Sequence, residues 1–284
     1  GSPMASLNLI HEAADPDALH VIFVHGLGGD ARSTWMHNPK DQATLWPSWI
    51  GEMVGCHVWV AGYGAALSGW TDTAMHLADL GEALFAALQV EQDMQGRRIV
   101  LVGHSLGGLV IKSGMTQAQA LGDPKRMALL KRIAGVAFIG TPHQGSHLAR
   151  FADMLRLLLR TNPQVTNMAS NDAWLKLLND QFRALHKQHN FGARVFFESR
   201  GVLIGRRFFC FDIGKRQIIV DRYSSDPGIA SVIPTAVEGD HFEIAKPKSR
   251  QAFIHKALVE FLEGIAGGTA GKTPTDRSSP LPWS

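Results

Sequence analysis

Apolar runs, each bounded by polar or glycine-rich residues, recur along most of the chain. They lie within residues 19–30, 56–63, 97–105, 133–146, 193–199 and 216–224. Their content of Val, Ile and Phe predicts six buried strands, and residues 7–10 predict an edge strand before them. Between the runs, apolar residues return with a helical period within residues 41–54, 71–90 and 251–265. Strands that alternate with helices predict an α/β fold, with a mostly parallel sheet and helices on both faces.

One segment, residues 146–190, interrupts this alternation. It reads as two or more helices, and Phe151, Leu155 and Leu158 lie on one apolar stripe. An ordinary crossover helix packed on the sheet needs far fewer residues. We therefore interpret 146–190 as a helical cap inserted over the site, with the ordinary crossover helix as the alternative.

The length of 284 residues and the apolar content of 45% suit one large α/β domain with a sizeable core. We place this domain at residues 4–266. Gly, Thr, Ser and Pro dominate from Gly267 onward, which predicts a disordered tail over residues 267–284. Residues 1–3, ahead of Met4, resemble a remnant of cloning and are left out of the fold prediction.

The sequence GHSLGG, residues 103–108, joins the third strand to a helix with almost no intervening turn. A serine at so sharp a corner is strained, and Gly103 and Gly107 stand where a Cβ would clash. This G-x-S-x-G elbow lifts the serine hydroxyl above the sheet, at the N-terminus of the following helix. Ser105 is therefore the predicted nucleophile. An incidental serine in a glycine-rich turn is the alternative interpretation.

A serine hydroxyl needs a base, a group that orients the base, and donors for the oxyanion. In the α/β-hydrolase fold that the elbow indicates, the chain order is serine, acid, histidine. His241 follows the last predicted strand and precedes the last helix, so it is the predicted base. His104 adjoins the serine, but we expect its side chain to point elsewhere across the turn. His25 and His143 are expected to make structural hydrogen bonds near the site.

Four carboxylates compete for the role of the acid. Glu198 ends the fifth strand, two strands after the nucleophile strand, and is the preferred residue. Asp221 ends the sixth strand and is the alternative. Asp226 lies in the following loop, and Asp240 is too close in sequence to His241 to brace its ring.

The oxyanion hole requires two backbone N–H groups. One is expected from Leu106, directly after the serine, and the other from the loop HGLGGD, residues 25–30, where Leu27 is the natural donor. A glycine-rich loop after a strand can also bind a dinucleotide phosphate. GLGGDA lacks the G-x-G-x-x-G spacing, so we do not favour a nucleotide site.

Composition narrows the other classes of function. The net charge of +3 is spread along the chain without a basic block, which gives no indication of a nucleic-acid partner. The two cysteines provide neither a disulfide framework nor metal-ligand spacing, so we predict no metal and no cofactor. The sequence has no apolar run of transmembrane length and no signal-peptide pattern, which favours a cytoplasmic location.

The motifs VIFVHGLGGD, GHSLGGLV, FIGTPHQGS, FFES and GDHFEIAKP together resemble one known family. They are similar to the lipase-like α/β-hydrolases related to GPI inositol-deacylases and to serine-active-site-containing proteins, over roughly residues 19–262. In that family a glutamate recurs in F-x-E-[ST], so the resemblance implies that Glu198 is the acid. Where relatives carry a second glutamate before a Ser-Ala pair, this chain has Tyr223, which removes one rival.

These observations predict a serine hydrolase, an esterase or lipase, that cleaves carboxylic esters through an acyl-enzyme. Ser105, His241 and Glu198 form the predicted triad, and Leu27 and Leu106 the oxyanion hole. The expected substrate is a small-molecule or lipid ester, with transient contact to a membrane surface through the cap. Two alternatives remain open: acyl transfer to an alcohol by the same triad, and a non-catalytic binding module on a hydrolase scaffold.

Overall fold

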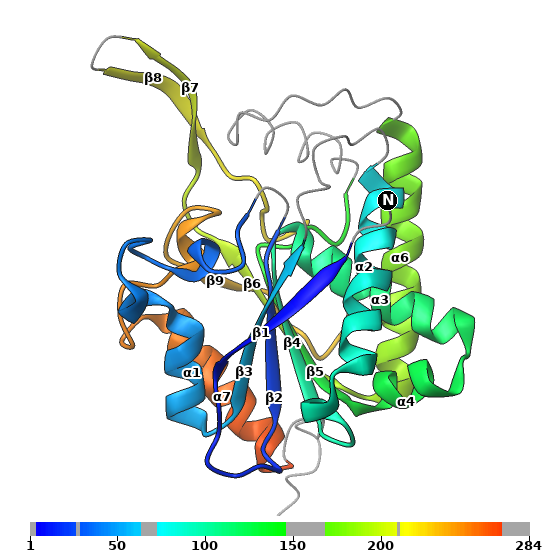
Figure 1. Cartoon of the computed structure of the whole chain (residues 1–284). Helices are drawn as coiled ribbons and strands as arrows, with labels where there is room; N and C mark the ends of the chain where they lie inside the picture. Colours follow the sequence, from blue (N-terminus) through cyan, green and yellow to red (C-terminus); the bar gives the residue numbers. More distant parts are fainter. Residues whose placement is uncertain (1–3, 27–28, 64–72, 146–167, 209–210, 269–284) are drawn as a thin grey trace, which may run out of the picture.

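The structure is a computed structural model that describes residues 4–26, 29–63, 73–145, 168–208 and 211–268. Within these residues the main sheet has the strand order β1-β3-β2-β4-β5-β6-β9 (Figure 1). Its strands are β1 (Ala5–His11), β2 (His20–Val24), β3 (His57–Tyr63), β4 (Ile99–His104), β5 (Ile133–Ile139), β6 (Gly192–Glu198) and β9 (Thr235–Val237). All neighbouring pairs are parallel except β1 with β3, so the carboxyl ends of β2 to β6 share one edge of the sheet.

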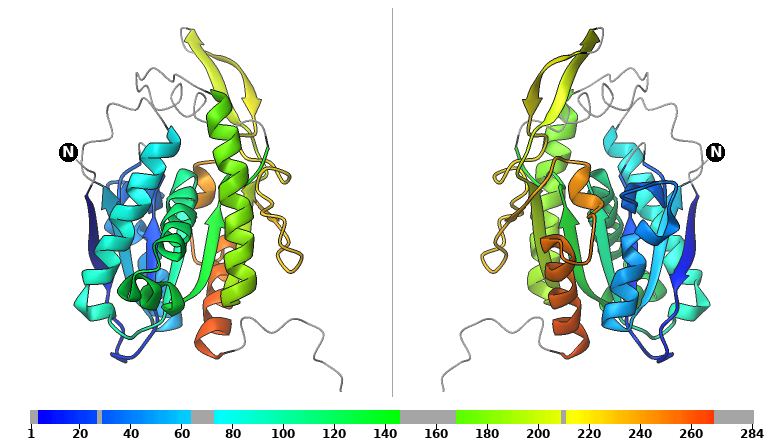
Figure 2. Two further views of the ribbon diagram at one scale, coloured as in Figure 1. Left: turned by 90° about the vertical axis from the view of Figure 1, so that its right-hand side faces the viewer. Right: turned by 90° about the vertical axis from the view of Figure 1, so that its left-hand side faces the viewer.

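Helices cover both faces of this sheet, as Figure 2 shows from two sides. One face carries α1 (Trp46–Val54) and α7 (Phe253–Ala266), and the other carries α2 (Thr73–Val90), α3 (Leu106–Leu121), α4 (Pro124–Arg132) and α6 (Met168–His189). Local chemistry sets several of the helix ends. Gly55 and Gly122 take left-handed conformations after α1 and α3, and Asp123 caps α4 by accepting from the Arg126 amide.

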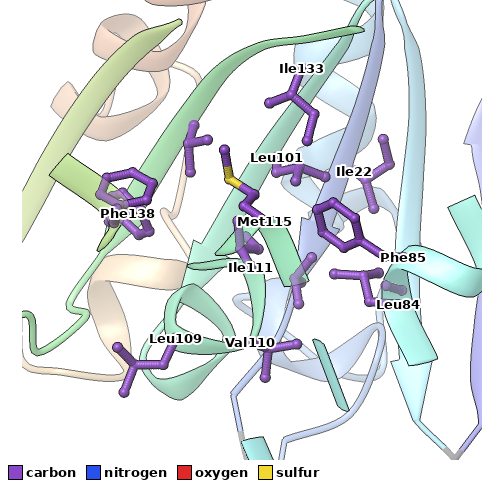
Figure 3. Close-up of a cluster of buried hydrophobic side chains, with 14 of the residues drawn as sticks. Ile22, Leu84, Phe85, Leu101, Leu109, Val110, Ile111, Met115, Ile133 and Phe138 are labelled. Carbon is purple, nitrogen blue, oxygen red and sulfur yellow. The ribbon is translucent and has the colours of Figure 1, made fainter. Parts of the chain in front are cut away.

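The buried apolar residues form one cluster on each face of the sheet. The cluster beneath α2 and α3 includes Phe85, Leu101, Ile111 and Phe138, all fully buried (Figure 3). The strands carry apolar side chains on both faces. Packing of these side chains against the helices of both layers holds the sheet between them. The central strand β4 is therefore a rigid support for the residue that follows it, Ser105. This architecture confirms the predicted α/β-hydrolase fold.

One predicted strand is wrong. Residues 216–224 do not form the sixth strand of the parallel sheet, whose place beside β6 is taken by β9. Ile219 and Val220 are buried, but their amides bind the Glu198 carboxylate instead of a neighbouring strand. The apolar run therefore predicted correctly that these residues are buried. A buried apolar run is not always a strand, however, and here Ile219 and Val220 lie in a loop.

The predicted cap, residues 146–190, is too long at its C-terminal end. Residues 168–189 form α6, which packs against α3 and contributes Leu178, Phe182 and Leu185 to the core. This part of the segment is the ordinary crossover helix between β5 and β6. Residues 146–167, the remainder of the predicted cap, lie outside the described residues.

A β-hairpin that the sequence analysis did not anticipate follows β6. It comprises β7 (Val202–Phe208) and β8 (Phe211–Gln217), which pair with each other in a separate two-stranded sheet. At the end of the domain, α7 stops at Ala266. The predicted tail beyond residue 268 and the predicted cloning remnant, residues 1–3, lie outside the described residues.

Candidate active site

Ser105 occupies the sharp turn between β4 and α3. Its backbone has φ 58° and ψ −130°, a left-handed value of φ that costs a non-glycine residue about 1–3 kcal/mol. Neighbouring groups hold this conformation: the Ser105 amide donates to the Ile139 carbonyl at 2.9 Å, and the Thr141 hydroxyl donates to the Ser105 carbonyl at 2.8 Å. The last residue of β5 and the loop that follows it therefore hold the amide and the carbonyl of the strained residue.

The glycines of the elbow permit close approaches between backbones. A Cβ on Gly107 would lie 2.4 Å from the Val24 carbonyl oxygen, and one on Gly103 would lie 2.7 Å from the Gly108 Cα. Side chains at these positions would push α3 away from β2 and β4. The G-x-S-x-G spacing is thus required by packing at this turn, as the sequence analysis inferred.

The three predicted triad residues meet although they are far apart in sequence. His241 Nε2 lies 3.0 Å from Ser105 Oγ, and His241 Nδ1 lies 2.9 Å from Glu198 Oε1. All three residues are buried, with relative exposures of 3% for Ser105, 1% for Glu198 and 0% for His241. Because a carboxylate only accepts, Nδ1 donates to Glu198, and Nε2 is left to face the serine hydroxyl as an acceptor.

Glu198 is held by backbone amides as well as by His241. The Ile219 amide donates to its Oε2 at 3.0 Å, and the Val220 amide donates to its Oε1 at 2.9 Å. The buried Glu198 carboxylate thus accepts hydrogen bonds from three donors. These bonds offset the cost of its desolvation and fix its position. The segment that was predicted as a strand instead serves as a clamp on this carboxylate.

The alternative acid, Asp221, is engaged elsewhere. Its Oδ1 accepts from the Ser224 amide at 2.8 Å and from the Ser224 hydroxyl at 2.9 Å, so it closes a surface turn. The carboxylate at hydrogen-bond distance from His241 Nδ1 is that of Glu198. The geometry therefore favours Glu198 over Asp221 as the group that orients the histidine.

Of the two predicted oxyanion donors, the structure describes Leu106, which follows Ser105 directly in the chain. Leu106 is buried at the first position of α3, where its amide has no partner within the helix. Leu27 lies outside the described residues. Its neighbour Gly26 approaches the elbow closely, since a Cβ there would lie 3.1 Å from Ser105 Cβ and 3.5 Å from the Leu106 amide nitrogen.

His104 does not point away from the site, contrary to the sequence prediction. Its Nε2 donates to the His241 carbonyl at 2.8 Å, and the two rings lie 5.1 Å apart. Burial and the nearby His241 lower the pKa of His104 to about 3, so the ring is neutral at physiological pH. The prediction failed because the side chain reaches the loop that contains His241 instead of following the elbow.

A buried lysine beside the site was also missed. Lys112 on α3 is fully buried, and burial lowers its pKa well below the usual range. Its Nζ donates to His143 Nδ1 at 2.8 Å and to Asn179 Oδ1 at 3.0 Å. Asn179 in turn donates to the Pro227 carbonyl at 3.1 Å. A lysine directly after the apolar run LVI of this helix was the available signal, since a lysine on a buried face needs buried partners.

The same network connects two loops of the site. The His143 amide donates to the Ser224 carbonyl at 2.6 Å, which ties the loop after β5 to the segment that clamps Glu198. His143 therefore makes structural hydrogen bonds, as predicted. His25 behaves similarly: its Nδ1 donates to the Gly26 carbonyl at 2.6 Å, within the loop that faces Ser105.

A metal-ligand cluster or a membrane-spanning helix would change the class of site. Among these residues no three His, Cys, Asp or Glu side chains gather as a metal ion would require. None of the described helices has both the length and the apolar character needed to cross a bilayer.

The fold, the strained serine elbow and the histidine behind it define a member of the alpha/beta hydrolase family, and the chain belongs to that family, whose model matches residues 21–260. Among curated proteins the chain is similar to protein SERAC1 of Bos taurus, with 28% identity over 271 residues. The aligned region covers 89% of this chain and 40% of the relative. This chain therefore spans less than half of the length of that relative.

Solved structures of other hydrolases share the fold. The mature lipase BlEst2 of Bacillus licheniformis matches with a TM-score of 0.59 and 19% identity, over 89% of this chain and 98% of that chain. A thermostable carboxyl esterase from Bacillus coagulans matches with a TM-score of 0.54 and 12% identity, over 93% and 94% of the two chains. At these identities the similarity concerns the fold.

Proposed function

We propose that this protein hydrolyses carboxylic esters through a covalent acyl-enzyme on Ser105. The observation that carries the proposal is the continuous chain of contacts from Ser105 Oγ through the His241 ring to Glu198, at 3.0 and 2.9 Å. This is the arrangement of nucleophile, base and orienting carboxylate that activates a serine hydroxyl. The names of the lipase and the esterase that share the fold support the same class of substrate.

In the first half of the reaction, Ser105 Oγ attacks the ester carbonyl carbon while His241 Nε2 takes the hydroxyl proton. The developing negative charge falls on the former carbonyl oxygen, where the amides of Leu106 and Leu27 donate to it. The tetrahedral intermediate then expels the alcohol, which leaves with the proton that His241 returns. The acyl group remains bonded to Ser105.

In the second half, water replaces the alcohol. His241 removes a proton from the water as its oxygen attacks the acyl carbon, and the same amides stabilise the second tetrahedral intermediate. Collapse breaks the bond to Ser105 Oγ, which recovers its proton from His241, and releases the carboxylic acid. The elbow contributes by holding Ser105 rigidly at the N-terminus of α3, where the helix dipole favours negative charge.

Glu198 keeps the imidazole in the tautomer that this cycle requires. Its Oε1 accepts from Nδ1, so the lone pair of His241 is placed on Nε2 beside the serine. The carboxylate also stabilises the imidazolium that forms during each attack. The Ile219 and Val220 amides fix Glu198 so that it can do both without moving.

The test is active-site labelling. A fluorophosphonate probe is expected to label the wild-type chain and not the Ser105→Ala variant, which should also lose hydrolysis of p-nitrophenyl acetate by several orders of magnitude. A Ser113→Ala variant, which changes another buried serine on α3, serves as the control and should keep labelling. Equal labelling and turnover by a folded Ser105→Ala variant would overturn the mechanism.

A further inference from the structure

The hairpin of β7 and β8 stands apart from the rest of the fold. Its strands pair from Val202 with Gln217 to Phe208 with Phe211, and this pairing accounts for the whole of the second sheet. Figures 1 and 2 show the hairpin extending beyond the carboxyl ends of the parallel strands, the edge of the sheet at which Ser105 lies. An isolated two-stranded hairpin gains little stability from its own pairing, so its contribution is to be sought in what it binds.

The sequence of the hairpin concentrates the positive charge of the protein. Residues 202–217 contain four basic residues, Arg206, Arg207, Lys215 and Arg216, and one acidic residue, Asp212. This excess equals the net charge of +3 of the entire chain, so the remaining residues are balanced. The pair at the end of the ladder, Phe208 and Phe211, is aromatic. A segment that combines basic and aromatic residues has the composition that binds the headgroup region of an anionic bilayer.

The base of the hairpin is joined to the proposed acid. Glu198 ends β6 just before the hairpin, and the Ile219 and Val220 amides just after it bind the Glu198 carboxylate. The strands also approach closely here, since a Cβ on Gly201 would lie 2.6 Å from the Gln217 amide nitrogen. A surface that binds the hairpin is therefore brought to the side of the molecule on which the ester would enter.

We propose that the β7–β8 hairpin docks the enzyme on an anionic lipid surface, which extends the proposed ester hydrolysis to esters held in such a surface. The net positive charge of the hairpin is attracted by an anionic lipid surface, and the aromatic residues at the end of its ladder have the composition of a segment that lies at such an interface. This assigns to the hairpin the membrane contact that the sequence analysis expected of the cap. A single-stranded nucleic acid also binds basic and aromatic residues, but the position beside the ester site favours the lipid surface.

The test measures binding and catalysis separately. The full chain is floated with phosphatidylcholine vesicles and with vesicles in which phosphatidylserine replaces part of the phosphatidylcholine. We expect binding to the anionic vesicles alone, and we expect added salt to weaken it. Ser105→Ala should bind as well as the wild type. Hydrolysis of p-nitrophenyl acetate is followed on the same preparations.

The decisive variant is Arg206→Gln with Arg207→Gln, which should weaken binding by about 30-fold at the usual contribution of each basic residue. Lys125→Gln with Lys131→Gln, two exposed lysines at the α4 end of the fold, should leave binding unchanged. Both variants should hydrolyse the soluble ester at the wild-type rate. Phe208→Ser with Phe211→Ser is a second test and should also reduce binding.

Several results would overturn docking by the hairpin. They are equal binding by the arginine variant, equal binding to neutral and anionic vesicles, or binding of a single-stranded oligonucleotide without binding of vesicles. A wild-type chain that binds anionic vesicles but hydrolyses no ester would contradict the proposed function and leave the docking intact.

Discussion

Two pairs of neighbouring histidines lie at opposite ends of the parallel sheet. At the carboxyl end, the rings of His104 and His241 lie 5.1 Å apart. At the amino end, His20 and His57 begin β2 and β3, and their rings stack at 4.4 Å with an interplanar angle of 19°. All four side chains are buried. Residue type and burial therefore do not distinguish the two pairs.

The groups around each pair do distinguish them. His241 lies between the Ser105 hydroxyl and the Glu198 carboxylate. One ring nitrogen therefore faces a group that can give up a proton, and the other faces a group that stabilises a positive charge on the ring. At the amino end, His20 Nδ1 accepts from the Trp59 indole at 3.0 Å, and His57 Nδ1 accepts from the Ala13 amide at 3.0 Å. Within the part of the chain that the structure describes, the buried Nε2 atoms of both have no hydrogen-bond partner. We expect the neighbours of a histidine to decide whether it can act as a base, and the described hydrogen-bond partners of His20 and His57 are both donors.

The carboxylate should therefore produce the largest effect. Glu198→Gln presents an amide to His241 Nδ1 and can stabilise the wrong tautomer, and the corresponding change in serine proteases lowers kcat by about 10⁴-fold. We expect a loss of similar scale, measured as kcat on one soluble ester. Folding is checked by circular dichroism, because the Ile219 and Val220 amides also depend on this side chain.

Asp221→Asn is the matched control for this change. Asp221 closes a turn with Ser224, so its variant should keep nearly all of the wild-type kcat and lose some stability. If Asp221→Asn proves inactive while Glu198→Gln remains near wild type, the assignment of the acid is wrong. The roles proposed for Ser105 and His241 would survive that result.

The second expected effect concerns His104, the neighbour of the proposed base His241. His104→Phe keeps a ring but removes the donor to the His241 carbonyl, which releases one constraint on the loop that carries the base. Because small displacements of a catalytic group are costly, we expect kcat to fall roughly 10- to 100-fold. His104→Gln, whose amide can replace the donor, should recover most of the activity.

The pair at the amino end provides the comparison for this prediction. His57→Phe also removes a buried histidine, and there the donor left behind is the Ala13 amide. That variant should lose stability while kcat for the folded protein stays at the wild-type value. A fall in kcat for His57→Phe equal to that of His104→Phe would mean that both act through general destabilisation.

This contrast also separates what the sequence predicted from what it did not. The apolar strands and the elbow at Ser105 depend on local pattern and sterics, so their positions were predictable. Chain order led to the choice of His241 and Glu198, and the structure brings these two side chains within hydrogen-bond distance of each other. The contacts of His104 and Lys112 were not predictable, because their partners at residues 241, 143 and 179 come close only when the sheet and its loops are assembled. The apolar run 216–224 was wrongly predicted as a strand of the parallel sheet. Its backbone amides can donate to a side-chain carboxylate, here that of Glu198, as well as to a neighbouring strand.

The smallest expected effect is on stability in acid. Burial and the adjacent His57 lower the pKa of His20 from 6.5 to about 4, with Asp93 acting in the opposite direction. Between these two values the unfolded chain binds a proton that the folded chain does not. Stability from this group is therefore fully present above pH 6.5 and is lost as the pH falls through 4. His104, whose pKa is lowered to about 3, adds a loss of the same sign.

The variant His20→Gln isolates the part of this loss that belongs to the amino end of the sheet. Glutamine can still accept from the Trp59 indole but does not titrate, so the variant should be less dependent on pH than the wild type. One proton bound only by the unfolded chain changes the free energy of unfolding by at most about 1.4 kcal/mol per pH unit. The measurement is urea unfolding of both proteins from pH 7 to pH 4. Parallel curves would show that His20 does not titrate on unfolding, whereas convergence of the two curves at low pH assigns the acid sensitivity to the histidine pair that has no catalytic neighbours.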